Sequence, residues 1–275
     1  MSSSEKRSVL CGFENAIFDL VASGATAKQW GEWLRVPLER AVAVSDLRLV
    51  IKLARAGAKG NPLCIALMGG RVALARDLVK QGASVTSTDE YGNSPLALAA
   101  TTKDEETMSL LLQKGACPDT ETGEGRSRRS LLYLAAANGR LPTVNVLVDA
   151  GADMNLRYCK ENGSTLGVAD VAAANGDVGI VTALIRSEVN VNAVDWKNST
   201  PLHKAACCTS STAAGVIDVL VKAGADVDAV NKSMVRVPLH YASDAGTPEA
   251  ILALLKNGAR VDEKDTHERS PLRYA

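Results

Sequence analysis

Polar and apolar positions follow one another in a fixed order: a polar turn, a helix with one apolar face, then a second amphipathic helix. The order is clearest at residues 195–206, DWKNSTPLHKAA. Pro201 suits the first helical position, where its missing N–H leaves no bond unmade, and Leu202 then points inward. Small residues such as Ala205 allow a second helix to lie close, and that helix ends at Gly224 in the usual C-terminal way.

The polar residues of this stretch have equally specific places. Asn198 lies where a tight turn needs left-handed backbone, which Asn tolerates better than most residues. The Thr200 hydroxyl is expected to cap the free N–H groups of the first helical turn. The stretch therefore predicts a turn, a cap and a helix.

The same signals recur along the chain. Gly-Ala dipeptides that end a helix lie 33 to 37 residues apart when Glu188 is counted as a degraded end, except for one step of 25. The Gly-Ala ends begin at Gly24, Gly57, Gly82, Gly115, Gly151, Gly224 and Gly258, and the helix starts lie at Pro37, Pro62, Pro95, Leu131, Pro201, Pro238 and Pro271.

A period near 33 residues, with a turn, a TPLH-like cap and two helices, resembles the ankyrin-repeat family over essentially the whole chain. The resemblance implies an all-α solenoid of paired antiparallel helices with β-hairpin or turn fingers, about eight units plus a partial C-terminal one. We expect a single domain over residues 1–275, with an N-terminal capping unit at 1–26, stacked repeats at 27–264 and an incomplete last repeat at 265–275.

Several units depart from a regular repeat. The step of 25 residues removes the segment between Ala58 and Pro62 from which a finger would project, so we expect a notch there. Residues 119–130, DTETGEGRSRRS, enlarge the fifth finger, and about three extra residues separate the helices of the seventh unit. In the sixth unit either Thr165 or Gly167 marks the helix start, and the non-glycine helix end implies an altered terminus.

Composition narrows the function classes. Lys and Arg together number 31, as do Asp and Glu, so no net field gathers nucleic acid. No apolar stretch is long enough to span a bilayer, and the six cysteines have no disulfide-like spacing. We therefore expect a monomer in a reducing compartment, the cytoplasm with the nucleus as the alternative, with neither a nucleic-acid partner nor membrane insertion.

Candidate chemistry is sparse. His203 and Cys207 share a helix face, next to Cys208, with His240 at the matching place one unit later, a set that would offer zinc ligands. The resemblance instead implies structural histidines that bond the backbone of the inter-repeat loop. No phosphate-binding glycine loop or nucleophile elbow is present in the sequence. We expect no enzyme activity, no cofactor and no metal site.

One basic run, Arg126, Arg128 and Arg129, lies in the enlarged finger. It is either a dock for an acidic or phosphorylated partner or a solvated loop. Ser127 is a candidate phosphorylation site, whereas Ser130 is expected to cap the following helix.

Asn155 and Asn192 occupy the position that is hydroxylated in some ankyrin-like proteins. Alternatively, each bonds the adjacent turn.

Partners of ankyrin-like proteins usually lie along the finger tips and the inner faces of the first helices. Tyr91, Trp196, Met234 and Arg236 are large or anchor-type residues at nominally exposed places on that surface. The expected partner-binding residues are Glu90, Tyr91, Thr101, Arg126, Arg128, Trp196, Lys197, Cys207, Met234 and Arg236. Two further tryptophans, Trp30 and Trp33, are placed to cover the missing finger.

The expected function is a non-enzymatic scaffold that binds partner proteins through its concave face and finger tips. The first alternative is a recognition module at the N-terminus of a larger adaptor, channel, ligase or kinase protein. It is favoured by a last half-unit without a polar cap, from which we expect the natural chain to continue past Ala275. The second alternative is a metal-binding protein or an enzyme that uses the His and Cys residues.

Overall fold

The computed structural model describes residues 34–123, 128–159 and 165–274. The expected capping unit at 1–26, the residues Trp30 and Trp33, and Arg126 and Ser127 lie outside these ranges. The chain divides into two compact units, Met1–Cys117 and Pro118–Ala275, called unit 1 and unit 2 below.

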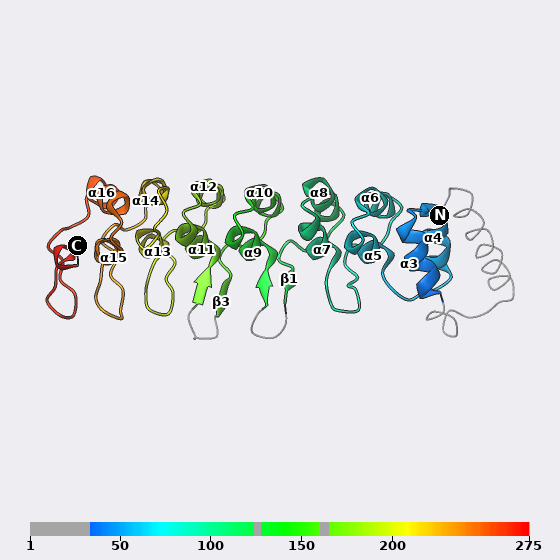
Figure 1. Ribbon diagram of the computed structural model, residues 1–275, viewed down its shortest axis with the longest axis horizontal. Helices are drawn as coiled ribbons and strands as arrows, with labels where there is room; N and C mark the ends of the chain where they lie inside the picture. The colour runs from blue at the N-terminus through cyan, green and yellow to red at the C-terminus, as the bar shows by residue number, and fades with distance from the viewer. Residues whose placement is uncertain (1–33, 124–127, 160–164, 275) are drawn as a thin grey trace. The chain divides into compact units, whose positions relative to one another are not determined.

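Unit 1 consists, in its described part, of antiparallel helix pairs. Within it the first helices α3, α5 and α7 pack in one row and the second helices α4, α6 and α8 in another (Figure 1). The pairs are α3 (Arg35–Ala43) with α4 (Leu47–Arg55), α5 (Pro62–Met68) with α6 (Val72–Lys80), and α7 (Pro95–Thr102) with α8 (Glu105–Gln113).

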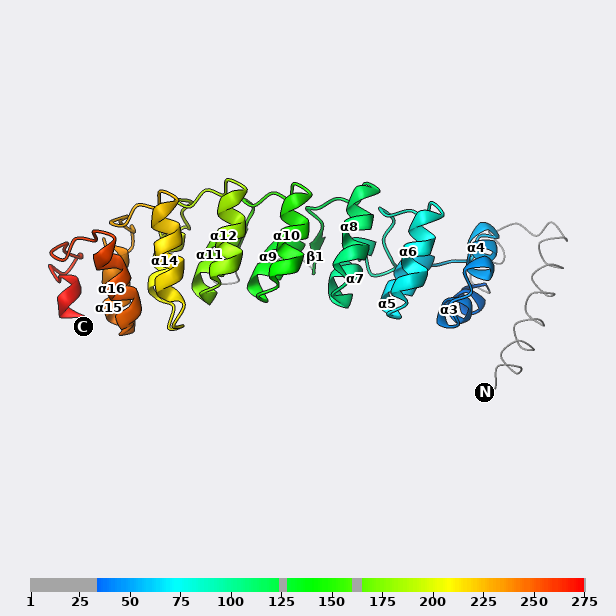
Figure 2. The same ribbon diagram turned by 90° about the horizontal axis from the view of Figure 1, so that it is seen from above.

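Unit 2 repeats this arrangement and adds two short hairpins, β1 (Glu121–Thr122) with β2 (Arg129–Ser130) and β3 (Arg157–Cys159) with β4 (Thr165–Gly167). Both pair antiparallel, with Glu121 opposite Ser130 and Tyr158 opposite Leu166. The helix pairs, which follow one another in Figure 2, are α9 (Leu131–Ala137) with α10 (Leu141–Asp149), α11 (Val168–Asn175) with α12 (Val178–Arg186), α13 (Pro201–Ala206) with α14 (Ala213–Lys222), and α15 (Pro238–Ala245) with α16 (Pro248–Lys256), followed by the 3₁₀ turn η2 (Pro271–Arg273).

The core of each unit is aliphatic, as the low aromatic content requires. Leu63 and Leu67 in unit 1, and Leu202 and Leu184 in unit 2, are completely or almost completely buried. Ala205 has no exposed surface, so neighbouring helices approach over small side chains.

The predicted helix ends are confirmed where they are described. Gly57, Gly151 and Gly258 all have left-handed backbone, with φ of 85°, 81° and 89°. Glu188 takes the same conformation, with φ of 63°, although a side chain there costs about 1–2 kcal/mol. The altered terminus predicted for the sixth unit is therefore present.

One predicted helix start is wrong, and at another the structure decides between two candidate residues. Helix α3 begins at Arg35, so the predicted start at Pro37 is wrong; Pro37 is tolerated as the third helical residue because first-turn N–H groups have no intrahelical partner. In the sixth unit Gly167, not Thr165, is the capping residue of α11. The Asp170 carboxylate accepts the Gly167 N–H at 2.8 Å and completes that cap.

The expected role of the Thr200 hydroxyl is wrong, because the hydroxyl lies against the ring of His203 and makes no side-chain cap bond. Nδ1 of His203 accepts the Thr200 backbone N–H at 3.1 Å and lies 2.9 Å from the Thr200 hydroxyl. An accepting Nδ1 leaves the ring proton on Nε2, which donates to the Arg236 carbonyl of the next repeat at 3.2 Å. His240 repeats the arrangement, bonding the Arg269 carbonyl at 3.0 Å. The structural role of both histidines is confirmed.

A second set of bonds crosses each repeat boundary in unit 2. A side-chain oxygen of one Asp or Asn accepts a backbone N–H of the next repeat, at distances from 2.7 to 3.4 Å. The acceptors are Asp119, Asn155, Asn192 and Asp228, and the matching donors are Asp153, Asn190, Asp226 and Arg260. We call this series the Asx ladder. It confirms that Asn155 and Asn192 bond the adjacent turn.

Candidate functional site

The finger turns of unit 2 are built on one acidic or amide side chain. Oδ1 of Asp195 accepts the backbone N–H groups of Lys197 and Ser199 at 2.9 and 2.8 Å. Asn198 has a left-handed φ of 61°, as its position predicts. Asn231 and Asp265 hold the next two turns in the same way, so the fingers have a defined backbone shape.

Neighbouring fingers of unit 2 are also joined to each other. The Lys232 N–H donates to the Lys197 carbonyl at 2.8 Å, and the Thr266 N–H donates to the Met234 carbonyl at 3.0 Å. Nδ2 of Asn198 adds a bond to the Val230 carbonyl at 3.1 Å. These bonds fix three successive finger tips as one surface.

That surface carries apolar side chains in water. Trp196 is 56% exposed and Met234 is 40% exposed. The ammonium of Lys197 lies 4.9 Å from the centre of the Trp196 ring, a cation–π contact that holds the indole in place. We call the exposed residues Val194, Trp196, Lys197, Val230, Met234 and Val235 the finger ledge.

The three valines of the ledge were not predicted from the sequence. The available signal was Val235, which lies three residues before Pro238, where the neighbouring finger has Asn198. Val235 takes a left-handed φ of 55°, which is strained for a β-branched residue. A strained residue suggests a functional site, so the valine at this turn position is the signal in the sequence that points to this finger.

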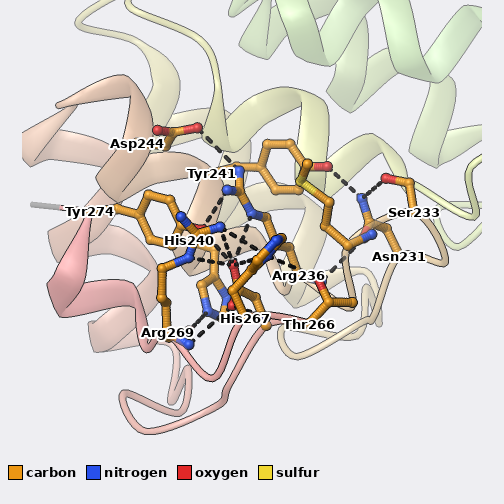
Figure 3. Close-up of polar contacts among 12 residues, drawn as sticks. Asn231, Ser233, Arg236, His240, Tyr241, Asp244, Thr266, His267, Arg269 and Tyr274 are labelled. Atoms are coloured by element: carbon orange, nitrogen blue, oxygen red, sulfur yellow. Dashed lines mark hydrogen bonds and ion pairs between the residues drawn. The ribbon is translucent and has the colours of Figure 1, made fainter.

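The prediction that Arg236 is exposed is wrong, because only 8% of the residue is accessible. Its guanidinium lies 4.3 Å over the ring of Tyr274, donates to the Tyr274 hydroxyl at 2.5 Å, and pairs with Asp244 at 3.2 Å (Figure 3). Arg236 therefore supports the ledge from beneath, and its bonds to Tyr274 span 38 residues.

Asp265 is the anion of this cluster. Burial opposes ionisation of its carboxyl group, but hydrogen bonds from the Tyr274 hydroxyl, from Arg269 and from the His267 N–H outweigh that effect and hold its pKa well below the usual range. Figure 3 shows Arg236, His267, Arg269 and Tyr274 gathered in this cluster. The cluster ties the last finger to the one before it.

The two cysteines of the seventh unit differ in exposure. Cys207 is exposed, as predicted, whereas Cys208 is buried. Both ring nitrogens of the nearby His203 are already occupied by the contacts described above. In the ranges that the structure describes, no three His, Cys, Asp or Glu residues are grouped to hold a metal ion.

The two described arginines of the enlarged finger, Arg128 and Arg129, make different contacts. Arg128 is exposed and faces Glu121 across the hairpin at 3.5 Å. Arg129 lies over the rings of Tyr133 and Tyr158, with its guanidinium carbon 5.9 and 5.5 Å from their centres. Ser130 caps α9, as predicted, by accepting the Tyr133 N–H at 3.1 Å.

Unit 1 presents a different kind of site where the finger is missing. Only residues 56–61 separate the end of α4 at Arg55 from the start of α5 at Pro62, so no finger projects between them and the expected notch is present. The notch is a cleft of about 1160 Å³. Its apolar lining includes Ile51, Ala54, Ile65, Met68 and Tyr91, and we call it the unit 1 cleft.

Polar residues border the unit 1 cleft. The Arg35 guanidinium donates to both carboxylate oxygens of Glu90, at 2.8 and 2.7 Å. This bond with Arg35 lowers the pKa of the Glu90 carboxyl group. Tyr91 next to it is 73% exposed. Thr101, on α7, is exposed as well and donates to the Leu98 carbonyl at 2.7 Å.

The comparisons with known proteins identify this architecture. A family model of ankyrin repeats, in three copies, matches residues 38–122, 63–158, 132–231 and 169–265. The solved ankyrin repeat domain of human ASB11 is similar in structure, with a TM-score of 0.61 and 25% identity over 78% of this chain and 91% of that one. No helix in the described part of the chain has the length and apolar character needed to cross a membrane.

Curated relatives match over part of their length. The p105 subunit of nuclear factor NF-kappa-B from Gallus gallus is 31% identical over 53% of this chain and 15% of its own length. The Neurogenic locus notch homolog protein 2 of Homo sapiens is 34% identical over 58% of this chain and 6% of its own length. The repeat period, the helix pairs and the family model agree, and the chain belongs to the ankyrin-repeat family.

Proposed function

We propose that this chain is a non-enzymatic scaffold that binds partner proteins through its finger tips and the inner faces of its first helices. Ankyrin repeats generally mediate protein–protein interaction. The observation that carries the proposal is the finger ledge, because it gathers apolar side chains in water on joined turns. Exposed apolar patches of this kind mark interaction surfaces.

The ledge has the properties of a rigid anchor site. Its backbone is held by the bonds between successive fingers, so a partner orders few additional groups on binding. Trp196 offers the largest apolar surface, and tryptophan is enriched among residues that dominate binding energies. Arg236 is buried, whereas Lys197, a member of the ledge, and the exposed Cys207 at the C-terminal end of α13 belong to the proposed contact area.

A second context is the recognition module of a larger protein. The relatives favour it, since their matching segments form 15% and 6% of their lengths. In either context we place the protein in the cytoplasm, with the nucleus as the alternative, because its cysteines show no disulfide-like spacing.

The test compares affinity capture with the parent chain and with a Trp196→Ala, Met234→Ala double variant. The matched control is Leu252→Ala, which removes an exposed apolar side chain from α16, away from the fingers. We expect proteins recovered with the parent and the control to fall at least about tenfold with the ledge variant, as about 1.4 kcal/mol of lost binding predicts. Circular dichroism verifies that all three chains fold.

Equal recovery by the ledge variant and the control would remove the ledge from the binding surface. Tyr91, Thr101 and Arg128, which are exposed in the described chain, would then be the next residues to substitute.

A further inference from the structure

Unit 2 shows what the edge of a finger bonds to in this protein. Lys232 and Thr266 each follow the residue that holds a finger turn, and each donates its backbone N–H to a carbonyl of the preceding finger. Glu90 is the corresponding residue of the unit 1 finger. It follows Asp89, whose Oδ1 accepts the N–H groups of Tyr91 and Asn93 at 2.9 and 2.8 Å. The turn is the same, but the preceding finger is missing.

The edge of this finger is therefore open toward the unit 1 cleft. No backbone carbonyl in the described ranges accepts the Glu90 N–H. The Ser87 carbonyl is satisfied from α5 and its capping residue, by Nδ2 of Asn61 at 2.6 Å and by the Cys64 thiol at 3.8 Å. The finger is thus bonded to the preceding repeat at Ser87, and the Glu90 N–H remains for a ligand.

The cleft beside this edge offers apolar surface, and its lining includes three cationic residues, Arg35, Arg55 and Lys59. Met68 is 58% exposed, and Ile51 and Ile65 are half-buried around it. Arg55, at the end of α4, is exposed on the wall and has no ion-pair partner within the part of the chain that the structure describes. An aliphatic side chain with a neighbouring carboxylate complements this lining.

The ion pair of Arg35 with Glu90 does not close the cleft to a ligand. Both side chains are exposed, so solvent screens the ion pair and leaves it weak. Opening it therefore costs less than the burial of an aliphatic side chain of the ligand contributes.

We propose that the unit 1 cleft binds an extended segment of a partner protein, which takes the place of the missing finger. A carbonyl of that segment accepts the Glu90 N–H, as the carbonyls of Lys197 and Met234 do in unit 2. An aliphatic side chain of the segment covers Met68, and a carboxylate pairs with Arg55. This mode resembles strand addition at a free edge. The cleft is a second site, separate in its residues from the finger ledge.

The probe is a library of random 12-residue peptides displayed on phage and selected on the full chain. We expect enriched peptides to share an aliphatic residue close to an acidic one. Their binding should fall at least about tenfold with Met68→Glu and remain with Trp196→Ala, the matched control in the ledge. The Glu90 amide should shift in NMR spectra and exchange more slowly with solvent when peptide is bound.

Ala54→Glu is a second cleft variant at an exposed position, and circular dichroism verifies the fold of each. Absence of enriched peptides, or peptides that bind the cleft variants and the parent equally, overturns the proposal. Peptides lost only with Trp196→Ala support the ledge and overturn the cleft. A photo-crosslink from position 68 to residues 1–33, which include Trp30 and Trp33, or to a second copy of the chain, assigns the cleft to that occupant and also overturns the proposal.

Discussion

The fingers of unit 2 and the cleft of unit 1 differ in whether a finger is present. The contact between neighbouring repeats also differs, at one position of the first helix. Two residues after the helix-opening proline, unit 2 has His203, whose ring caps its own helix and bonds the Arg236 carbonyl. Unit 1 has Cys64 at that place. The Cys64 Sγ lies as far as 4.0 Å from the corresponding Asn93 carbonyl oxygen. The cap of this helix comes from Asn61 instead.

Helix packing buries the core of a repeat even where the finger is missing. Leu63 next to the missing finger and Leu202 next to a complete one are both fully buried. Helix α5 still packs against both α3 and α7. A finger can therefore be lost without loss of the core, which leaves the finger positions open to variation in shape and binding.

The largest expected effect tests whether the core is equally well packed beside the missing finger and beside a complete one. The substitutions are Leu63→Ala and Leu202→Ala. Each is expected to lower the free energy of unfolding by about 2–5 kcal/mol, because each removes a fully buried side chain and leaves a cavity. Urea unfolding followed by circular dichroism measures both losses. A loss for Leu63→Ala that is smaller by more than about 2 kcal/mol would mean that the missing finger weakens its own repeat.

The second test uses pH to distinguish the inter-repeat contact of His203 from that of Cys64. Burial lowers the pKa of His203 from 6.5 to about 4, whereas burial raises the pKa of the Cys64 thiol to about 12. Between pH 6.5 and 4 the unfolded chain binds the His203 proton and the folded chain does not, so stability falls as the pH falls through this range. The full shift corresponds to about 3 kcal/mol. The Cys64 thiol stays neutral in this pH range.

The measurement is urea unfolding of the parent and of His203→Gln at pH 7 and pH 5. Because Gln does not titrate, the variant should lose less stability than the parent between these pH values. The variant itself should be less stable at pH 7 by about 1–3 kcal/mol, since a buried backbone N–H loses its acceptor. Identical losses in the two chains between pH 7 and pH 5 would exclude His203 as the source of the pH response.

The smallest effect concerns the finger turns. Three residues before the proline, unit 1 has Gly92 and unit 2 has Val235, with φ of 80° and 55°. Val235→Asn gives this turn the residue that Asn198 provides in the neighbouring finger, so we expect a gain of about 1 kcal/mol in stability. Thermal unfolding checks it. Val230→Asn, at an exposed position without positive φ, should change stability by less than about 0.5 kcal/mol.

Most of the fold was predictable because its signals are local. A proline at a helix start and a glycine at a helix end act on residues within one turn, so their positions predicted most helices correctly. The same locality explains the errors. At Pro37 the first helical turn extends two residues upstream, and at Thr200 the hydroxyl contacts the ring of the histidine three residues later instead of capping the first turn.

The candidate surface was harder to predict because exposure depends on distant residues. Arg236 is buried by Tyr274 and Asp265, which belong to the following repeat. The notch followed from the spacing of glycines, but its apolar lining did not, since Met68 and Ile51 resemble ordinary core positions in the sequence. Trp196 and Met234 were found because large apolar side chains are unusual in turns.

The Asx ladder of unit 2 makes the state of each repeat boundary separately observable. Each rung engages a different amide, those of Asp153, Asn190, Asp226 and Arg260. In an array where each unit packs mainly on its neighbours, boundaries open individually as well as together. These four amides therefore form a built-in gauge: their relative rates of hydrogen exchange rank the boundaries from weakest to strongest within one unmodified molecule.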